Sequence, residues 1–159
     1  MAKILIIYYS RTGNTEKMAN LVQEGVSEVE GVKVKMQKVE ETGVQDLLDA
    51  DGIIAGSPTY YGSMCWEMKK LFDDSVEHHG SLAGKVGGAF SSAANVGGGN
   101  ETTVLDILHA MIIHGMIVQG RALGDHYGPV SVGAPDDRAA KQCRRMGKMI
   151  AELAKKLHG

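Results

Sequence analysis

Cysteine is scarce in this chain, which has only Cys65 and Cys143 among its 159 residues. Two cysteines so far apart in sequence do not indicate a disulfide framework. We expect Cys65 to fill a small buried space, and a reactive thiol near a site is the alternative. The six histidines lack the spacing of a metal site, so no metal is expected.

An excess of charge of one sign and long apolar runs are also missing. The chain has 17 Lys and Arg against 19 Asp and Glu, a formal charge of −2. This balance gives no electrostatic reason to expect binding to nucleic acid or to a membrane surface. No apolar run reaches the length of a membrane span. No signal-peptide pattern precedes the first expected strand, so the expected location is cytoplasmic.

What the chain does contain is a regular alternation of short apolar runs and amphipathic stretches. The expected strands cover residues 3–9, 31–36, 53–56, 85–90 and 116–118, and the expected helices cover 14–29, 45–50, 63–76, 100–114 and a last stretch opening at Pro135. This order predicts one α/β domain over residues 1–159, a three-layer sandwich with a five-stranded parallel sheet. The second strand alternates apolar and charged residues, as an edge strand does, which favours the order 2-1-3-4-5.

A loop rich in hydroxyl groups joins the first buried strand to the first helix. A helix start offers free backbone N–H groups and the positive end of the helix dipole, which suits a phosphate. The loop has no lysine and therefore differs from the loop that binds nucleoside triphosphates, so a phosphate monoester fits better. An ordinary capped helix is the alternative. The loop consists of Ser10, Arg11, Thr12, Gly13, Asn14 and Thr15.

Two further loops are expected beside it, because ligands of such sheets bind beyond the carboxyl ends of the strands, where the winding reverses. One carries adjacent tyrosines, whose faces can stack on a flat ring. The other is built of small residues, whose backbone amides can approach a ligand closely. The alternative is that both tyrosines pack against neighbouring loops, and we expect this of one of them. The two loops are residues 57–64 and 91–99.

Several motifs resemble a known family. The run ILIIYYSRTGNTEKMA resembles the phosphate loop of flavodoxins. The runs GSPTYYGSM, FSSAANVGGGNETT, IIHGMIVQG and HYGPVSVGAP resemble the quinone-oxidoreductase branch of flavodoxin-like proteins, once named for supposed binding to the tryptophan repressor. That branch usually has a further segment where this chain has only residues 119–126. It also often has two histidines where this chain has Ile113 and His114.

The resemblance implies a flavodoxin-like fold that binds FMN. It places the FMN phosphate on residues 10–15, the ring beside Pro58, Thr59, Tyr60, Tyr61 and Gly62, and the pyrimidine edge of the ring on the backbone of Ser92, Ala93, Ala94, Asn95, Gly97 and Gly98. The implied activity is electron transfer from NAD(P)H through FMN to quinone-like acceptors. Residues catalysing that transfer cannot be named from the sequence. A homo-oligomer is compatible with the branch.

Two other functions remain open. The chain could be a flavodoxin in the strict sense, an FMN electron carrier that serves a redox partner protein, or a flavin-free binding domain. A response-regulator receiver shares this topology, but it has acidic residues at the ends of the first and third strands, where this chain has Ser10 and Ser57. In either flavin protein, the task of the chain is to bind the flavin, orient it and tune its potential.

Overall fold

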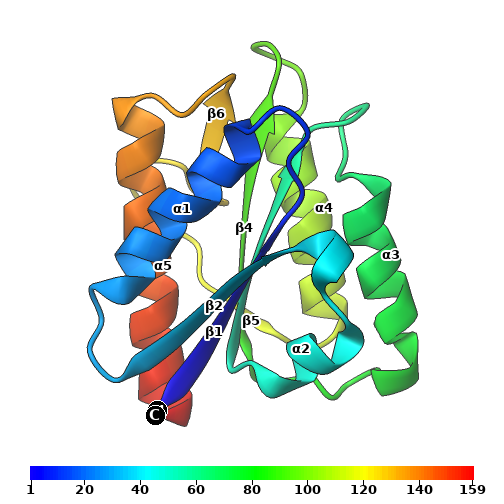
Figure 1. The fold of residues 1–159 in the computed structure, drawn as a ribbon, viewed down its shortest axis with the longest axis vertical. Helices are drawn as coiled ribbons and strands as arrows, with labels where there is room; N and C mark the ends of the chain where they lie inside the picture. Colours follow the sequence, from blue (N-terminus) through cyan, green and yellow to red (C-terminus); the bar gives the residue numbers. More distant parts are fainter.

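The computed structural model describes all 159 residues and shows a parallel sheet between two layers of helices (Figure 1). The predicted strand order is confirmed: the sheet runs β2-β1-β3-β4-β5, with every neighbouring pair parallel. A sixth strand, which the sequence did not predict, also pairs with β4. The strands are β1 Ala2–Tyr8, β2 Val32–Lys38, β3 Gly52–Pro58, β4 Val86–Ala93, β5 Ile117–Val118 and β6 Val130–Val132.

The two short strands β5 and β6 occupy one position in the sheet, beside β4. Ile117 pairs with Val86, and Val130 pairs with Ser91. The two pairings are five residues apart on β4 but thirteen residues apart on the partner segment. The partner segment therefore contains eight more residues than an uninterrupted strand would need. The fifth strand is thus split by an insertion, and its second half lies at the carboxyl end of β4.

Helices cover both faces of the sheet. In Figure 1, α1 and α5 cover one face, and α3 and α4 cover the other. Two short 3-10 helices, η1 and η2, follow β2 and α3. The helices are α1 Asn14–Ser27, η1 Val39–Glu41, α2 Val44–Asp49, α3 Trp66–Asp74, η2 Ser75–His78, α4 Asn100–Ile113 and α5 Asp137–His158.

The alternation of side chains along β1 builds both cores. Ile4 and Ile6 belong to a buried cluster with residues of α1 and α5, whereas Leu5 and Ile7 belong to a second cluster with residues of α3 and α4. Successive side chains of a strand point to opposite faces, so one apolar run serves both layers. Cys65 is fully buried in the second cluster, as expected of a small filler.

Helices α1 and α5 touch backbone to backbone through two glycines. A Cβ atom on Gly147 would lie 2.1 Å from the carbonyl oxygen of Val22, and one on Gly25 would lie 1.9 Å from that of Arg144. Only glycine fits at either position without a shift of one helix. This close crossing fixes α1 against α5 and so helps to fix the loop that precedes α1.

Several predicted boundaries are wrong by one to three residues, and three of them have a clear structural reason. The helix expected from residue 63 begins at Trp66, because Ser63 is bonded into a turn with Tyr60. The last helix begins at Asp137, because the Asp136 side chain accepts a hydrogen bond from the Ala139 amide and caps it. Strand β4 extends three residues beyond Phe90, because those residues pair with β6. None of the helices combines the length and apolar character that a membrane crossing requires.

Candidate functional site at the carboxyl edge of the sheet

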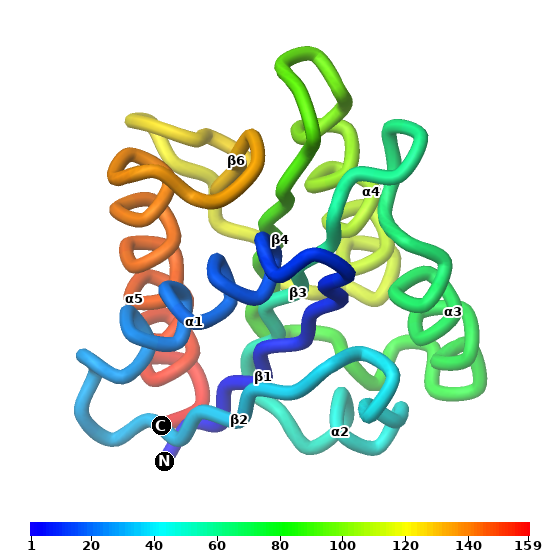
Figure 2. Tube along the Cα trace, turned by 45° about the horizontal axis from the view of Figure 1, so that its top comes forward, coloured from blue at the N-terminus to red at the C-terminus, as the bar shows by residue number.

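Three loops meet where β1, β3 and β4 end, at the same edge of the sheet (Figure 2). The Thr15 hydroxyl lies 2.9 Å from that of Ser92, which links the first loop to the carboxyl end of β4. The Thr59 hydroxyl lies 3.0 Å from that of Ser91, which ties the second loop to the same place. The structure therefore brings together the three segments that the sequence predicted at a ligand edge.

The first loop holds unused donors at the start of α1. The Ser10 hydroxyl accepts hydrogen bonds from the amides of Gly13 (3.1 Å) and Glu16 (3.2 Å). Gly13 precedes the helix with φ of 92°, a conformation open mainly to glycine. The amides of Thr12, Asn14 and Thr15 donate no hydrogen bond within the chain. These free amides and the helix dipole form a cradle that fits a phosphate.

The side chains of the first loop differ in exposure. Arg11 and Thr12 are exposed, Ser10 and Asn14 are half-buried, and Thr15 is buried. The exposed members can reach a ligand without moving the fold. Thr15 is already bonded to Ser92, so its hydroxyl links two segments of the site while its amide stays free.

The second loop is a two-residue turn with unusual geometry. Tyr60 and Ser63 exchange both backbone hydrogen bonds, at 2.9 and 3.2 Å. The residues between them, Tyr61 and Gly62, have φ of 51° and 78°. Positive φ at both central positions defines a type I′ turn, which favours asparagine and glycine. A tyrosine there is strained by about 1–3 kcal/mol, and such strain gathers at functional sites.

Aromatic rings lie along this loop. The Tyr60 ring meets that of Tyr9 edge to face, with centroids 6.2 Å apart, whereas the Tyr61 side chain is fully exposed. Tyr60 therefore packs partly against a neighbour, as the alternative interpretation expected of one tyrosine. The negative charge of Glu67 raises the pKa of Tyr9. Burial and a hydrogen bond to Glu16 raise the pKa of Tyr8 to about 12. Both phenols are thus neutral at physiological pH.

The third segment differs from its prediction as a loop beginning at residue 91. Ser92 and Ala93 belong to β4, and the carbonyl of Ser92 accepts a hydrogen bond from the Thr59 amide at 2.7 Å. Only residues 94–99 form the loop. Ala94, Asn95 and Gly97 are exposed there, and the Gly98 amide bonds to the carbonyl of Asn95. The backbone predicted to face a ligand is therefore partly engaged in the sheet.

Helix α4 contributes to the second loop through contacts that were not predicted from the sequence. Ser63 donates a hydrogen bond to Asp106 at 2.6 Å, and Thr102 donates to the carbonyl of Gly62 at 2.6 Å. Thr103 lies 3.1 Å from the hydroxyl of Thr59. These polar residues occupy one face of the first turns of an otherwise apolar helix, and that spacing was the signal available.

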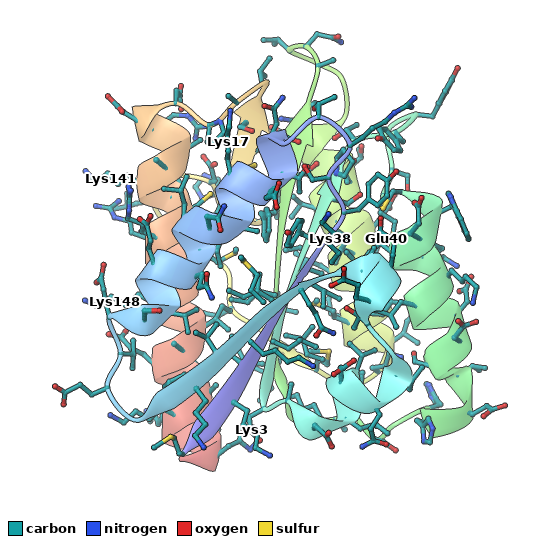
Figure 3. All side chains as sticks on the ribbon, in the orientation of Figure 1. Lys3, Lys17, Lys38, Glu40, Lys141 and Lys148 are labelled. Atoms are coloured by element: carbon teal, nitrogen blue, oxygen red, sulfur yellow. The ribbon has the colours of Figure 1, made fainter.

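Charges of both signs surround the site. Figure 3 shows Lys17 and Lys141 in the first turns of α1 and α5, Lys38 at the carboxyl end of β2, and Glu40 just after it. Mixed charges create little long-range field. The edge is therefore not built to attract a strongly charged macromolecule from a distance.

Fold and site together define a class: a doubly wound α/β protein with free amides at a helix start, an aromatic turn and a small-residue loop at one sheet edge. The flavodoxin family model matches residues 6–155. The chain is 42% identical to a flavodoxin of Aquifex aeolicus, over 96% of this chain and 86% of the relative. It is 35% identical to an NAD(P)H dehydrogenase (quinone) of Archaeoglobus fulgidus, over 99% of this chain and all of that relative.

Solved structures agree. Oxidised flavodoxin 2 from Bacillus cereus matches with a TM-score of 0.80 and 30% identity, over 95% of this chain and 99% of the other. A flavodoxin, WrbA-like protein from Agrobacterium tumefaciens matches with a TM-score of 0.82 and 26% identity, over 99% of both chains. The chain belongs to the flavodoxin family of flavin-dependent redox proteins.

Proposed function

We propose that this protein binds FMN at the carboxyl edge of its sheet and uses it to pass electrons from NAD(P)H to quinone-like acceptors. The observation that carries FMN binding is the cradle at the start of α1. Three amides there have no partner in the chain, and Ser10 holds the loop in shape. A flavin with a terminal phosphate would satisfy these donors, whereas riboflavin would leave them unpaired.

In this proposal each loop has one task. Residues 10–15 bind the phosphate, with Arg11 supplying a positive charge. Residues 58–62 orient the ring, which Tyr60 and Tyr61 can contact through their faces. Residues 92–98 meet the polar edge of the ring through the backbone that the sheet leaves free. FMN held by these loops would supply the chemistry for hydride transfer from a nicotinamide and for electron transfer to the acceptor.

Two observations support a small-molecule acceptor. Relatives about 35% identical over their full length are NAD(P)H dehydrogenases (quinone). The net charge of −2 and the mixed charges at the edge provide little steering toward a charged protein partner. A flat quinone needs no such field, and the turn at Tyr61 is exposed to solvent.

A second candidate, an FMN carrier without its own substrate, is favoured by chain length. A flavodoxin of Clostridium saccharobutylicum aligns with this chain over 160 positions, 98% of this chain and 99% of the relative. The quinone dehydrogenase of Archaeoglobus fulgidus needs 192 positions to align with these 159 residues. That enzyme therefore has additional segments that this chain lacks.

The test is steady-state oxidation of NADH and NADPH by the FMN-loaded protein with a benzoquinone as acceptor. The matched control is the same concentration of free FMN. Turnover well above that control supports the oxidoreductase. Turnover equal to the control, from a protein that still binds FMN tightly, favours the carrier. A colourless protein that takes up no added FMN would refute both.

A further inference from the structure

The most unusual backbone conformation in the molecule is that of Tyr61, and packing of its own side chain does not stabilise it. Tyr61 has φ of 51° and is the only residue other than glycine with a positive φ. Its side chain is fully exposed, so no packing energy offsets the backbone strain. Something else must hold the turn, because a bulky residue left alone would relax to a negative φ.

Two side chains of α4, Asp106 and Thr102, form hydrogen bonds to the turn, and we call this pair of bonds the grip. Ser63 donates to the carboxylate of Asp106 at 2.6 Å. Thr102 lies 2.6 Å from the carbonyl of Gly62 and 2.9 Å from that of Gly99. A hydroxyl has one proton to donate. The carbonyl of Gly99 already accepts hydrogen bonds from the amide and the hydroxyl of Thr103. The Thr102 hydroxyl therefore donates its proton to the carbonyl of Gly62.

The contact between the two loops is also tight. A Cβ atom on Gly99 would lie 2.8 Å from the Cα atom of Gly62, so the backbones touch directly. The turn therefore rests on a fixed surface made by the start of α4. It is gripped at two successive residues, Gly62 and Ser63, immediately after the strained one.

We infer that Asp106 and Thr102 are positioning residues for the ring of the bound flavin. This inference rests on the proposed function. They act through Ser63 and Gly62, hold Tyr61 in its left-handed conformation, and so present the aromatic turn to the ring before any ligand arrives. A turn ordered in advance avoids an entropy cost at binding, so the two residues contribute to affinity without touching the flavin.

The position of the grip gives the inference a specific signature. Asp106 acts on the ring side of the site, far along the chain from the phosphate cradle. Asp106→Ala should therefore weaken FMN and riboflavin by the same factor, about tenfold, as expected for loss of one hydrogen bond to a charged acceptor. Asp106→Asn keeps an oxygen that can accept from Ser63 and should restore affinity to within about twofold of the parent.

The main experiment needs no bound flavin. Amide hydrogen exchange of Tyr60 and Ser63 in the flavin-free protein reports the two backbone bonds that close the turn. We expect faster exchange at both amides in Asp106→Ala and parent-like exchange in Asp106→Asn. Glu152→Ala, which removes an exposed carboxylate from α5, is the control for lost charge and should leave both rates unchanged.

A double substitution tests the link to backbone strain. Glycine adopts positive φ freely, so Tyr61→Gly should make the grip less necessary. Asp106→Ala should then cost less than about threefold in affinity in the Tyr61→Gly background, against about tenfold in the parent. If Asp106→Ala does not fold, Ser63→Ala removes the same bond from the other side.

Several outcomes would overturn the inference. These are unchanged exchange at Tyr60 and Ser63 in both Asp106→Ala and Ser63→Ala, a loss of affinity confined to FMN, or an equal cost of Asp106→Ala in both backgrounds. Failure of the proposed function is separate and would show as no FMN uptake by the parent. The exchange rates of the flavin-free protein would then still decide whether α4 holds the turn.

Discussion

Replacing Ser10 with alanine should weaken FMN much more than riboflavin. The Ser10 hydroxyl accepts hydrogen bonds from the amides of Gly13 and Glu16, at 3.1 and 3.2 Å. These bonds fold the loop so that the free amides of Thr12, Asn14 and Thr15 lie together at the start of α1. Ser10→Ala removes both bonds, and the loop must then be ordered when the ligand binds.

The expected magnitude follows from those two bonds. A neutral hydrogen bond contributes about 0.5–1.5 kcal/mol, so their loss amounts to about 1–3 kcal/mol. If this whole cost falls on binding, affinity for FMN drops by about 5- to 150-fold, since 1.4 kcal/mol is a factor of ten. Riboflavin has no phosphate and does not need an ordered cradle. Its affinity should change by less than about twofold.

The assay is a titration of the flavin-free protein with FMN and with riboflavin, followed by flavin fluorescence. Ser27→Ala is a matched control, because Ser27 is an exposed serine at the opposite end of α1 that makes no side-chain hydrogen bond. That variant should behave like the parent. An unchanged ratio of FMN to riboflavin affinity in Ser10→Ala would show that the phosphate does not lie in this loop.

Three further outcomes are expected. Gly147→Ala should lower the free energy of unfolding in urea by about 1–3 kcal/mol, because the new Cβ atom would lie 2.1 Å from the Val22 carbonyl; a gain of about 1 kcal/mol, as at an open helix position, would contradict the close crossing. Bound FMN should be almost non-fluorescent through contact with Tyr60 or Tyr61, and alanine at either position should weaken binding; two variants that bind like the parent would exclude stacking. Burial lowers the pKa of His114, so the free energy of unfolding should fall as pH drops below about 6.5, where the imidazole is protonated in the unfolded chain but not in the folded one. His114→Gln should reduce this dependence of the unfolding free energy on pH. The same dependence in His114→Gln and the parent would refute the prediction.

Much of the fold was predictable because its signals are local. The apolar run of β1 has alternate residues in two different cores, and the alternating pattern of β2 marks a real sheet edge. The edge pattern of the second strand favoured the order 2-1-3-4-5, which the sheet has. The first loop was predictable for the same reason, since strand, loop and helix start follow one another directly in the chain.

What escaped prediction depends on partners distant in sequence. Strand β6 is only three residues long and has no periodicity to reveal it; it is a strand because it pairs with Ser91–Ala93. The grip of Asp106 on Ser63 spans 43 residues, and neither residue type is unusual at its position. Positive φ at Tyr61 could not be foreseen, because tyrosine disfavours it and the compensating contacts come from α4.

The segment between the two halves of the fifth strand bears directly on the choice between enzyme and carrier. It is short, and Arg138 of α5 holds it in place. Arg138 bonds the carboxylate of Asp125 and the carbonyl of Val130, each at 2.6 Å, and Asp125 accepts from the Val130 amide at 3.0 Å. The hydrogen bond to the Asp125 carboxylate raises the pKa of Arg138.

A segment tied in this way is a fixed edge of the sheet. In the proposed oxidoreductase, the exposed turn at Tyr61 and the loop of residues 94–99 would contact the nicotinamide, because this chain lacks the additional segments of the longer quinone dehydrogenase. Rapid NAD(P)H oxidation would therefore show that those two loops suffice, and Tyr61→Ala should then raise the KM for NAD(P)H.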